Sequence, residues 1–191
     1  KTGVEINDRM QTSQSHIYAI GDCCMSYQFT HVSGTQGAMA MRNALFFGSE
    51  RVSAMLIPWV TYTQPEVAHV GLYEQDIVRA GLKYNTYVKH LDDVDRAILE
   101  SETEGFVKLH IKQGSDKILG ATIVATNAGE MISEISVAMQ NKIGASGIVT
   151  VIHPYPTQAE AIRGAASMYM LTKLTPTVKA ILRNLMTFSR S

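Results

Sequence analysis

The stretch that decides the fold is residues 107–125, which read VKLHIKQGSDKILGATIVA. Its first six residues alternate strictly between apolar and polar side chains, which is typical of a strand with one buried face. A turn at residues 114–116 follows, and residues 118–125 form a second, mostly apolar segment that favours a buried strand. We therefore expect a β-hairpin whose first strand has one apolar and one cationic face.

Weaker signals on either side of this hairpin predict the rest of a domain. Two strands, and a short helix between them, are expected at residues 58–63, 84–89 and 74–80. After the hairpin, the pattern predicts a helix from about residue 128, capped by Asn127, and a last core helix at residues 158–171. Strands followed by helices around an antiparallel sheet place residues 50–175 in the α+β class.

Residues 1–49 have the pattern of an α/β unit instead. A short apolar run at residues 17–20 ends in Gly21-Asp22, as a buried parallel strand ends at the carboxyl edge of its sheet. A helix is expected at residues 30–47. Ligands of open α/β sheets bind at that edge, where Asp22 can accept hydrogen bonds from sugar hydroxyls and the helix start offers N–H groups. Taken alone, a Gly-Asp dipeptide is more often an ordinary turn.

Residues 176–191 form a tail in which a helix is expected to begin at Pro176. The apolar positions of that helix make one stripe of Val178, Ile181, Leu182, Leu185 and Met186. Two interpretations of the stripe stay open. We favour packing against the chain's own domain over contact with a membrane surface, because the polar face carries few cations.

Composition excludes several classes of protein. The 191 residues are 46% hydrophobic, and 17 basic residues balance 17 acidic ones, so the formal net charge is zero. That balance argues against a nucleic-acid partner and favours self-association, and no apolar run reaches the roughly 18 residues of a membrane span. The adjacent Cys23 and Cys24 indicate a reducing, cytoplasmic compartment, and we interpret them as packing residues. The sequence begins at Lys1 without an initiator Met or an apolar signal region, so we expect a piece of a longer protein.

A second candidate site is the segment HPYPTQAE at residues 153–160. Its two prolines fix the backbone just before a helix, so that His153, Tyr155 and Glu160 are presented from a stiff turn. The simpler interpretation is a helix start in which Thr157 and Glu160 form a capping box. Both interpretations can hold together. We expect no metal-ligating cluster, because the histidines lack a mutual ligand spacing.

Several of these segments occur together in one known family. They are residues 12–22, the run WVTYTQPEVA at 59–68 with VGL at 70–72, the pair Gly120-Ala121, and Pro156-Thr157 with Glu160. In this order and spacing, the chain resembles the pyridine nucleotide-disulfide oxidoreductases over about residues 1–172, and their lipoamide-dehydrogenase-like and mercuric-reductase-like members in particular. Residues 1–49 are similar to the end of the family's FAD-binding domain, and residues 50–175 to its dimerisation domain.

The resemblance implies cofactors and a partner. Gly21 and Asp22 would bind FAD, with Asp22 at the ribitol, and the backbone N–H groups of Thr30, His31 and Val32 would face the flavin pyrimidine edge. The full-length protein would use FAD and NAD(P)H. It would form a homodimer in which the end of one dimerisation domain reaches the partner subunit's active site. Its substrate would be a small molecule, either a thiol or disulfide or a metal ion.

Tyr155 departs from the disulfide reductases of this family, which carry a proton-shuttling histidine at its position and a glutamate at that of Glu160. A tyrosine has an ordinary pKa of about 10, against about 6.5 for histidine, and is therefore a poor base at neutral pH. Mercuric reductases resemble the chain in having tyrosine there. They end, however, in a vicinal cysteine pair, whereas this chain ends in MTFSRS.

We therefore expect the C-terminal dimerisation part of a mercuric-reductase-like, FAD-dependent NAD(P)H oxidoreductase. The isolated chain should be inactive, because it lacks the family's Gly-rich FAD loop, redox cysteine pair and NAD(P)H domain. The alternatives are a lipoamide-dehydrogenase-like disulfide reductase and an assembly domain without reductase activity. We also expect a cis peptide bond between Tyr155 and Pro156, and a Glu160 carboxylate that accepts from a backbone N–H or from His153.

Overall fold

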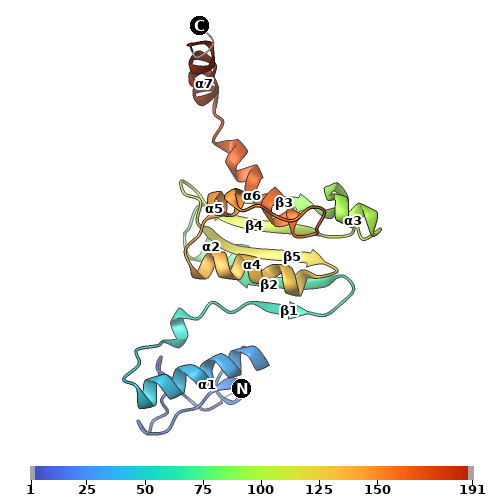
Figure 1. Ribbon diagram of the computed structural model, residues 1–191. Helices are drawn as coiled ribbons and strands as arrows, with labels where there is room; N and C mark the ends of the chain where they lie inside the picture. The colour runs from blue at the N-terminus through green and yellow to red at the C-terminus, as the bar shows by residue number, and fades with distance from the viewer. Residues whose placement is uncertain (1–2, 189–191) are drawn as a thin grey trace. The chain divides into compact units, whose positions relative to one another are not determined.

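The computed structural model describes residues 3–188 and divides the chain into two compact units, one ending at Ile57 and one beginning at Pro58 (Figure 1). Each unit has its own hydrophobic core, so each is described by itself.

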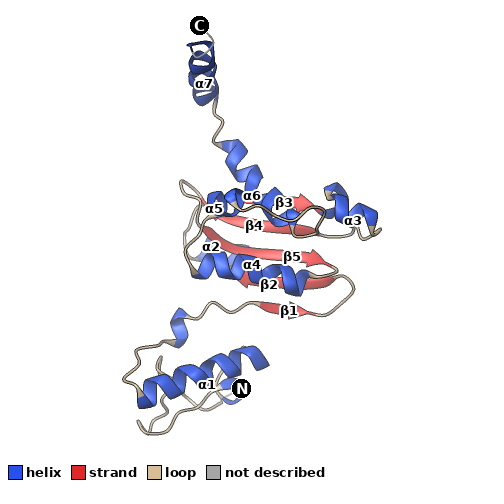
Figure 2. Cartoon of the chain, viewed as in Figure 1, coloured by secondary structure: helices blue, strands red, loops and turns tan. Residues whose placement is uncertain are grey.

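The second unit is built on a five-stranded antiparallel sheet in the order β1-β2-β5-β4-β3 (Figure 2). Its strands are β1 (Trp59–Thr61), β2 (Glu66–Gly71), β3 (Tyr84–His90), β4 (Phe106–Lys112) and β5 (Ile118–Ala125). The expected hairpin is confirmed, since β4 and β5 pair with Leu109 opposite Ala121. Strand β2 was not predicted. It lies on the other side of β5, where its mixed sequence takes its register from the partner strand.

Two long helices cover one face of this sheet, α4 (Ala128–Gln140) over β1, β2 and β5, and α6 (Glu160–Thr172) over β3 and β4. The strands and helices bury these residues between them: Ala68, Val70, Val107, Leu109, Ile111, Ala121, Ile123, Met131, Ile132, Ile135, Ala161, Ile162, Ala165 and Tyr169. Small alanine side chains on α6 let its backbone lie close to the strands. The α+β prediction is therefore confirmed.

The opposite face of β4 is less cationic than expected. His110 is only 4% exposed, and its Nδ1 lies 2.9 Å from the hydroxyl of Thr86. His69 on β2 is similarly buried and hydrogen-bonds Thr122 at 2.9 Å while its ring stacks on Tyr73. Burial lowers the pKa of both imidazoles, which keeps them neutral at pH 7. Only Lys108 and Lys112 therefore carry a charge on this face of β4. The alternating sequence of β4 could not predict that His110 is buried.

The remaining helices of this unit are α2 (Glu74–Arg79), α3 (Asp95–Leu99), α5 (Ala145–Thr150), α7 (Pro176–Phe188) and the one-turn η3 (Leu91–Asp93). The short helix expected at residues 74–80 is confirmed as α2, whose end Gly81 marks in the sequence. Helices α3 and α5 were not predicted, because five or six residues without such a glycine are too few to show a 3.6-residue period. The expected caps are wrong in detail. Asn127 precedes α4 without a side-chain cap, and Thr157 donates its hydroxyl to the Pro154 carbonyl at 2.9 Å, so α6 begins at Glu160 without a capping box.

The first unit contains one long helix, α1 (Thr30–Leu45), which confirms the helix prediction to within two residues, and two one-turn helices, η1 (Gly21–Cys23) and η2 (Val52–Ala54). The strand expected at residues 17–20 is absent from it, and only an isolated bridge between Gln11 and Tyr18 forms there. A parallel strand requires hydrogen bonds from neighbouring strands, and residues 3–57 supply none beyond this bridge.

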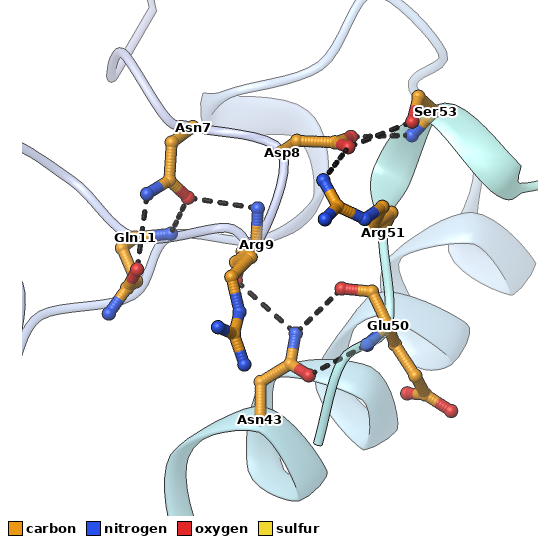
Figure 3. A network of polar contacts seen from close by, with 8 residues as sticks. All are labelled: Asn7, Asp8, Arg9, Gln11, Asn43, Glu50, Arg51 and Ser53. Carbon is orange, nitrogen blue, oxygen red and sulfur yellow. Dashed lines mark hydrogen bonds and ion pairs between the residues drawn. The ribbon is translucent and has the colours of Figure 1, made fainter. Parts of the chain in front are cut away.

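A polar network closes the first unit around the end of α1 (Figure 3). The Asn43 amide accepts from the Glu50 N–H at 3.0 Å and donates to the Glu50 carbonyl at 2.9 Å. The Asp8 carboxylate accepts from the backbone N–H and hydroxyl of Ser53, both at 2.8 Å, and these bonds lower its pKa. Side chains distant in sequence thus hold residues 50–53 against the loop at residues 7–11.

The network makes a prediction about Asn43→Ala. Asn43 is buried and satisfies two backbone groups of Glu50, so its loss should destabilise this closure by about 1–3 kcal/mol. Hydrogen exchange of the Glu50 amide should accelerate accordingly. Arg42→Ala is the matched control, since it removes only an exposed ion pair with Glu50 worth less than about 1 kcal/mol. Equal exchange rates in the two variants would contradict the prediction.

Candidate functional site

The segment between α5 and α6 carries the predicted catalytic residues. The Tyr155–Pro156 bond is cis, as expected. His153 is held firmly, with Nδ1 3.1 Å from the Val151 carbonyl oxygen and Nε2 2.9 Å from Glu134 Oε1. The carboxylate that faces His153 is therefore Glu134 on α4, and of the two alternatives for Glu160 the hydrogen bond from His153 is wrong. The sequence could not single out Glu134, because it lies 19 positions upstream on a different helix.

Tyr155 is 70% exposed, yet its phenol is held in place. The O–H donates to Asp95 Oδ2 at 2.6 Å. This hydrogen bond and the charge of Asp95 raise the pKa of Tyr155, and the charge of Glu160 raises it slightly further. The phenol is thus a neutral group at physiological pH. Asp95, the first residue of α3, was not recognised from the sequence, because it lies 60 positions from Tyr155.

Tyr155 and Glu160 share a surface depression in which charges of both signs are placed. Its polar lining includes Tyr155, Glu160, Asp95, Lys89, Asp93 and Arg163. Lys89 pairs with Asp93, which lowers the pKa of that carboxyl. The structure therefore brings together two of the three predicted catalytic residues, while His153 faces α4 and does not line the depression.

A second polar contact fixes the same loop on the other side of Pro156. The buried Gln158 amide donates to Glu102 at 2.8 Å and to Glu100 at 3.3 Å, both just beyond α3. Residues 155–158 are therefore attached to the region of α3 at two points.

The candidate cofactor residues lie in the first unit. Gly21 has a φ of +71°, and its N–H donates to the side-chain carbonyl of Gln36 at 2.7 Å. Asp22 follows with its side chain exposed. Gln36 is fully buried, and its Nε2 has no hydrogen-bond partner among residues 3–188. The neighbouring Cys23 and Cys24 carry free thiols. Cys23 is exposed, so the expectation that it packs in the interior is wrong.

The start of α1 agrees only in part with expectation. Thr30 and His31 are exposed. Val32 is buried, and its N–H donates to the Phe29 carbonyl at 3.1 Å. The first turn of the helix thus uses the N–H of Val32 in this structure, and the expected role of Val32 at the flavin stays a prediction.

Residues 3–188 lack two features that a sequence of this kind could carry. No group of three or more histidine, cysteine, aspartate or glutamate side chains within residues 3–188 is arranged to hold a metal ion. No helix in the same range combines the length and the apolar character needed to cross a membrane. The apolar stripe of α7 is exposed, with 59% of Leu185 accessible, so the expected packing on the chain's own domain is not observed.

Comparison with known proteins gives one family. Residues 57–166 match the pyridine nucleotide-disulphide oxidoreductase dimerisation domain. Mercuric reductase of Staphylococcus aureus is 36% identical over 87% of the chain, and that of Bacillus cereus 36% identical over 84%. The chain spans only 31% and 25% of these two proteins, so it covers less than a third of each.

Solved structures show the same fold. The crystal structure of LpdA from Mycobacterium tuberculosis matches 87% of the chain and 36% of its own length, with a TM-score of 0.80 and 28% identity. The flavoprotein disulfide reductase RclA of Escherichia coli matches with a TM-score of 0.79 at 21% identity, over 86% of the chain and 38% of its own, a similarity of fold alone. The domain match covers more than half of the chain, and with it the chain belongs to the pyridine nucleotide-disulphide oxidoreductase family, whose dimerisation domain it carries.

Proposed function

We propose that the chain is the C-terminal part of a mercuric-reductase-like, FAD-dependent NAD(P)H oxidoreductase that acts as a cytoplasmic homodimer. The observation that carries this proposal is Tyr155, an exposed phenol hydrogen-bonded to the Asp95 carboxylate, at the position where the resemblance implies a histidine in disulfide reductases. A neutral phenol is a poor proton shuttle, but its oxygen can still accept a hydrogen bond from a substrate. Relatives that are mercuric reductases support the same choice.

The residues of the first unit fit part of FAD. The exposed Asp22 carboxylate would accept hydrogen bonds from ribitol hydroxyls, and the start of α1 at Thr30 and His31 would favour the electron-rich pyrimidine edge. The unpaired Nε2 of the buried Gln36 leaves one further donor near Gly21. Bound FAD would accept a hydride from NAD(P)H and pass the electrons to a substrate. The domain division into residues 1–49, 50–175 and 176–191 remains part of this proposal.

The second unit would supply the dimer contacts and one half of a shared site. Tyr155 and Glu160 would face the partner subunit's flavin, where Tyr155 contacts a thiol, disulfide or metal-ion substrate. His153, fixed by Glu134, would hold the loop rather than react. A lipoamide-dehydrogenase-like disulfide reductase is the second candidate, because the chain carries the dimerisation domain of the pyridine nucleotide-disulphide oxidoreductases. Contact of α7 with a membrane surface is a weaker alternative for the tail.

The first prediction of this proposal concerns assembly. The chain should sediment as a homodimer at tens of micromolar, because it carries the dimerisation domain and has no net charge to oppose association. A monomer at that concentration would contradict the assembly role assigned to residues 58–188.

A second prediction concerns flavin. The isolated chain should purify colourless and should not oxidise NAD(P)H, because no Gly-rich loop for the FAD pyrophosphate occurs in its sequence. Absorption spectroscopy after incubation with FAD and gel filtration measures the retained flavin. A stoichiometric flavin spectrum would contradict the prediction.

A third prediction concerns the reaction of the full-length protein. Tyr155→Phe should lower the turnover of the oxidising substrate about 10-fold or more and leave flavin reduction by NAD(P)H unchanged, because Tyr155 acts only in the second half-reaction. Stopped-flow measurement separates the two half-reactions. Tyr155→His should create weak disulfide reductase activity. If Tyr155→Phe turns over every metal, thiol and quinone acceptor normally, Tyr155 is a packing residue.

A further inference from the structure

The contact between Tyr155 and Asp95 determines how the phenol oxygen can be used. A phenol has one proton, and here that proton is donated to Asp95 Oδ2 at 2.6 Å. Most of the Tyr155 side chain remains exposed. A group that approaches the phenol oxygen from solvent therefore contacts its lone pairs and not its proton.

The position of Asp95 is itself well supported. Its preceding residue, Val94, is buried, and Leu91 and Ala97 on either side are fully buried, so the start of α3 is anchored in the core. Gln158 attaches the Tyr155 loop to the far end of α3 through Glu102. The segments of the donor and the acceptor are therefore held together by a second contact that does not involve Tyr155.

The charges around the phenol favour its neutral form. Asp95 and Glu160 are the carboxylates that act on Tyr155. Lys89 is paired with Asp93, and Arg163 on α6 lies in the same depression. The cation nearest in sequence on α3, Arg96, pairs with Glu100. Two of the local cations thus have their own carboxylate partners.

We infer that Asp95 is a positioning residue, which accepts the hydrogen bond of the protonated Tyr155 phenol so that the lone pairs of the phenol oxygen face the substrate as a hydrogen-bond acceptor. This inference rests on the proposed function of Tyr155. Without the Asp95 carboxylate, the phenol would rotate freely and could donate its proton to the substrate or to water. The same oxygen would then be poorly placed to bind a cationic or hydrogen-bond-donating substrate.

The first measurement uses the chain itself and no activity. Phenolate absorbance is titrated with pH, and subtraction of the Tyr155→Phe titration isolates Tyr155 from the other tyrosines. Asp95→Asn keeps an acceptor of the same shape but removes the charge, so ionisation of Tyr155 should shift to lower pH. Asp95→Glu should restore most of the original titration. Asp92→Asn is the matched control, because it removes an equal, exposed charge three residues away and should leave the titration unchanged.

The second measurement uses the full-length protein. Asp95→Asn should lower substrate turnover about 10-fold with flavin reduction by NAD(P)H unchanged, and Asp92→Asn should have no effect. Circular dichroism and the unfolding midpoint confirm that each variant folds.

The outcomes distinguish a failure of the proposed function of Tyr155 from a failure of the positioning role of Asp95. If Tyr155→Phe leaves turnover unchanged, the proposed function of Tyr155 fails, whatever the titration shows. If Tyr155→Phe lowers turnover but Asp95→Asn neither shifts the titration nor lowers turnover, the positioning role of Asp95 is wrong. A shift of equal size in Asp92→Asn also overturns it, since the effect would then be one of general charge.

Discussion

The second unit depends on the burial of one face of the β4–β5 hairpin beneath α4 and α6. Leu109, Ile111 and Ile123 are almost completely excluded from water, and each such side chain contributes about 1.5–3 kcal/mol of transfer free energy. Since β5 lies at the centre of the sheet, its pairing with β2 and β4 sets the register of the outer strands. The position of α6 on β3 and β4 follows, and with it the place of Glu160 and of the Tyr155 loop that precedes it.

The sequence predicts best the strands and the helix that pack together in this buried core. The period of two in β4, the apolar run of β5 and the helix that follows were all identified, because burial on one face imposes a regular pattern. The short helices α3 and α5 carry no such pattern. The apolar run at residues 17–20 predicted a strand that does not form, because no neighbouring strand in residues 3–57 pairs with it.

In the candidate site, too, some residues could be recognised from the sequence and others could not. Tyr155 and Glu160 could be selected because they stand in one rigid segment next to prolines. Their partners could not. Asp95 reaches Tyr155 across 60 positions and Glu134 reaches His153 across 19, and both contacts exist only because the fold brings the segment between α5 and α6 against two other helices, α3 and α4. Hydrogen bonds between distant carboxylates and a loop leave no local signature in the sequence.

Tyr155 is central to the proposed function, because the resemblance implies a histidine at its position in disulfide reductases of the family. A phenol there would take a base away from the site and leave an oxygen that accepts hydrogen bonds rather than exchanging protons. The most direct test is the structure of the full-length protein with FAD bound. The account predicts a homodimer in which the Tyr155 oxygen faces the partner subunit's flavin and still donates to Asp95. A Tyr155 that lies on an outer surface, away from both flavins of the dimer, would contradict it.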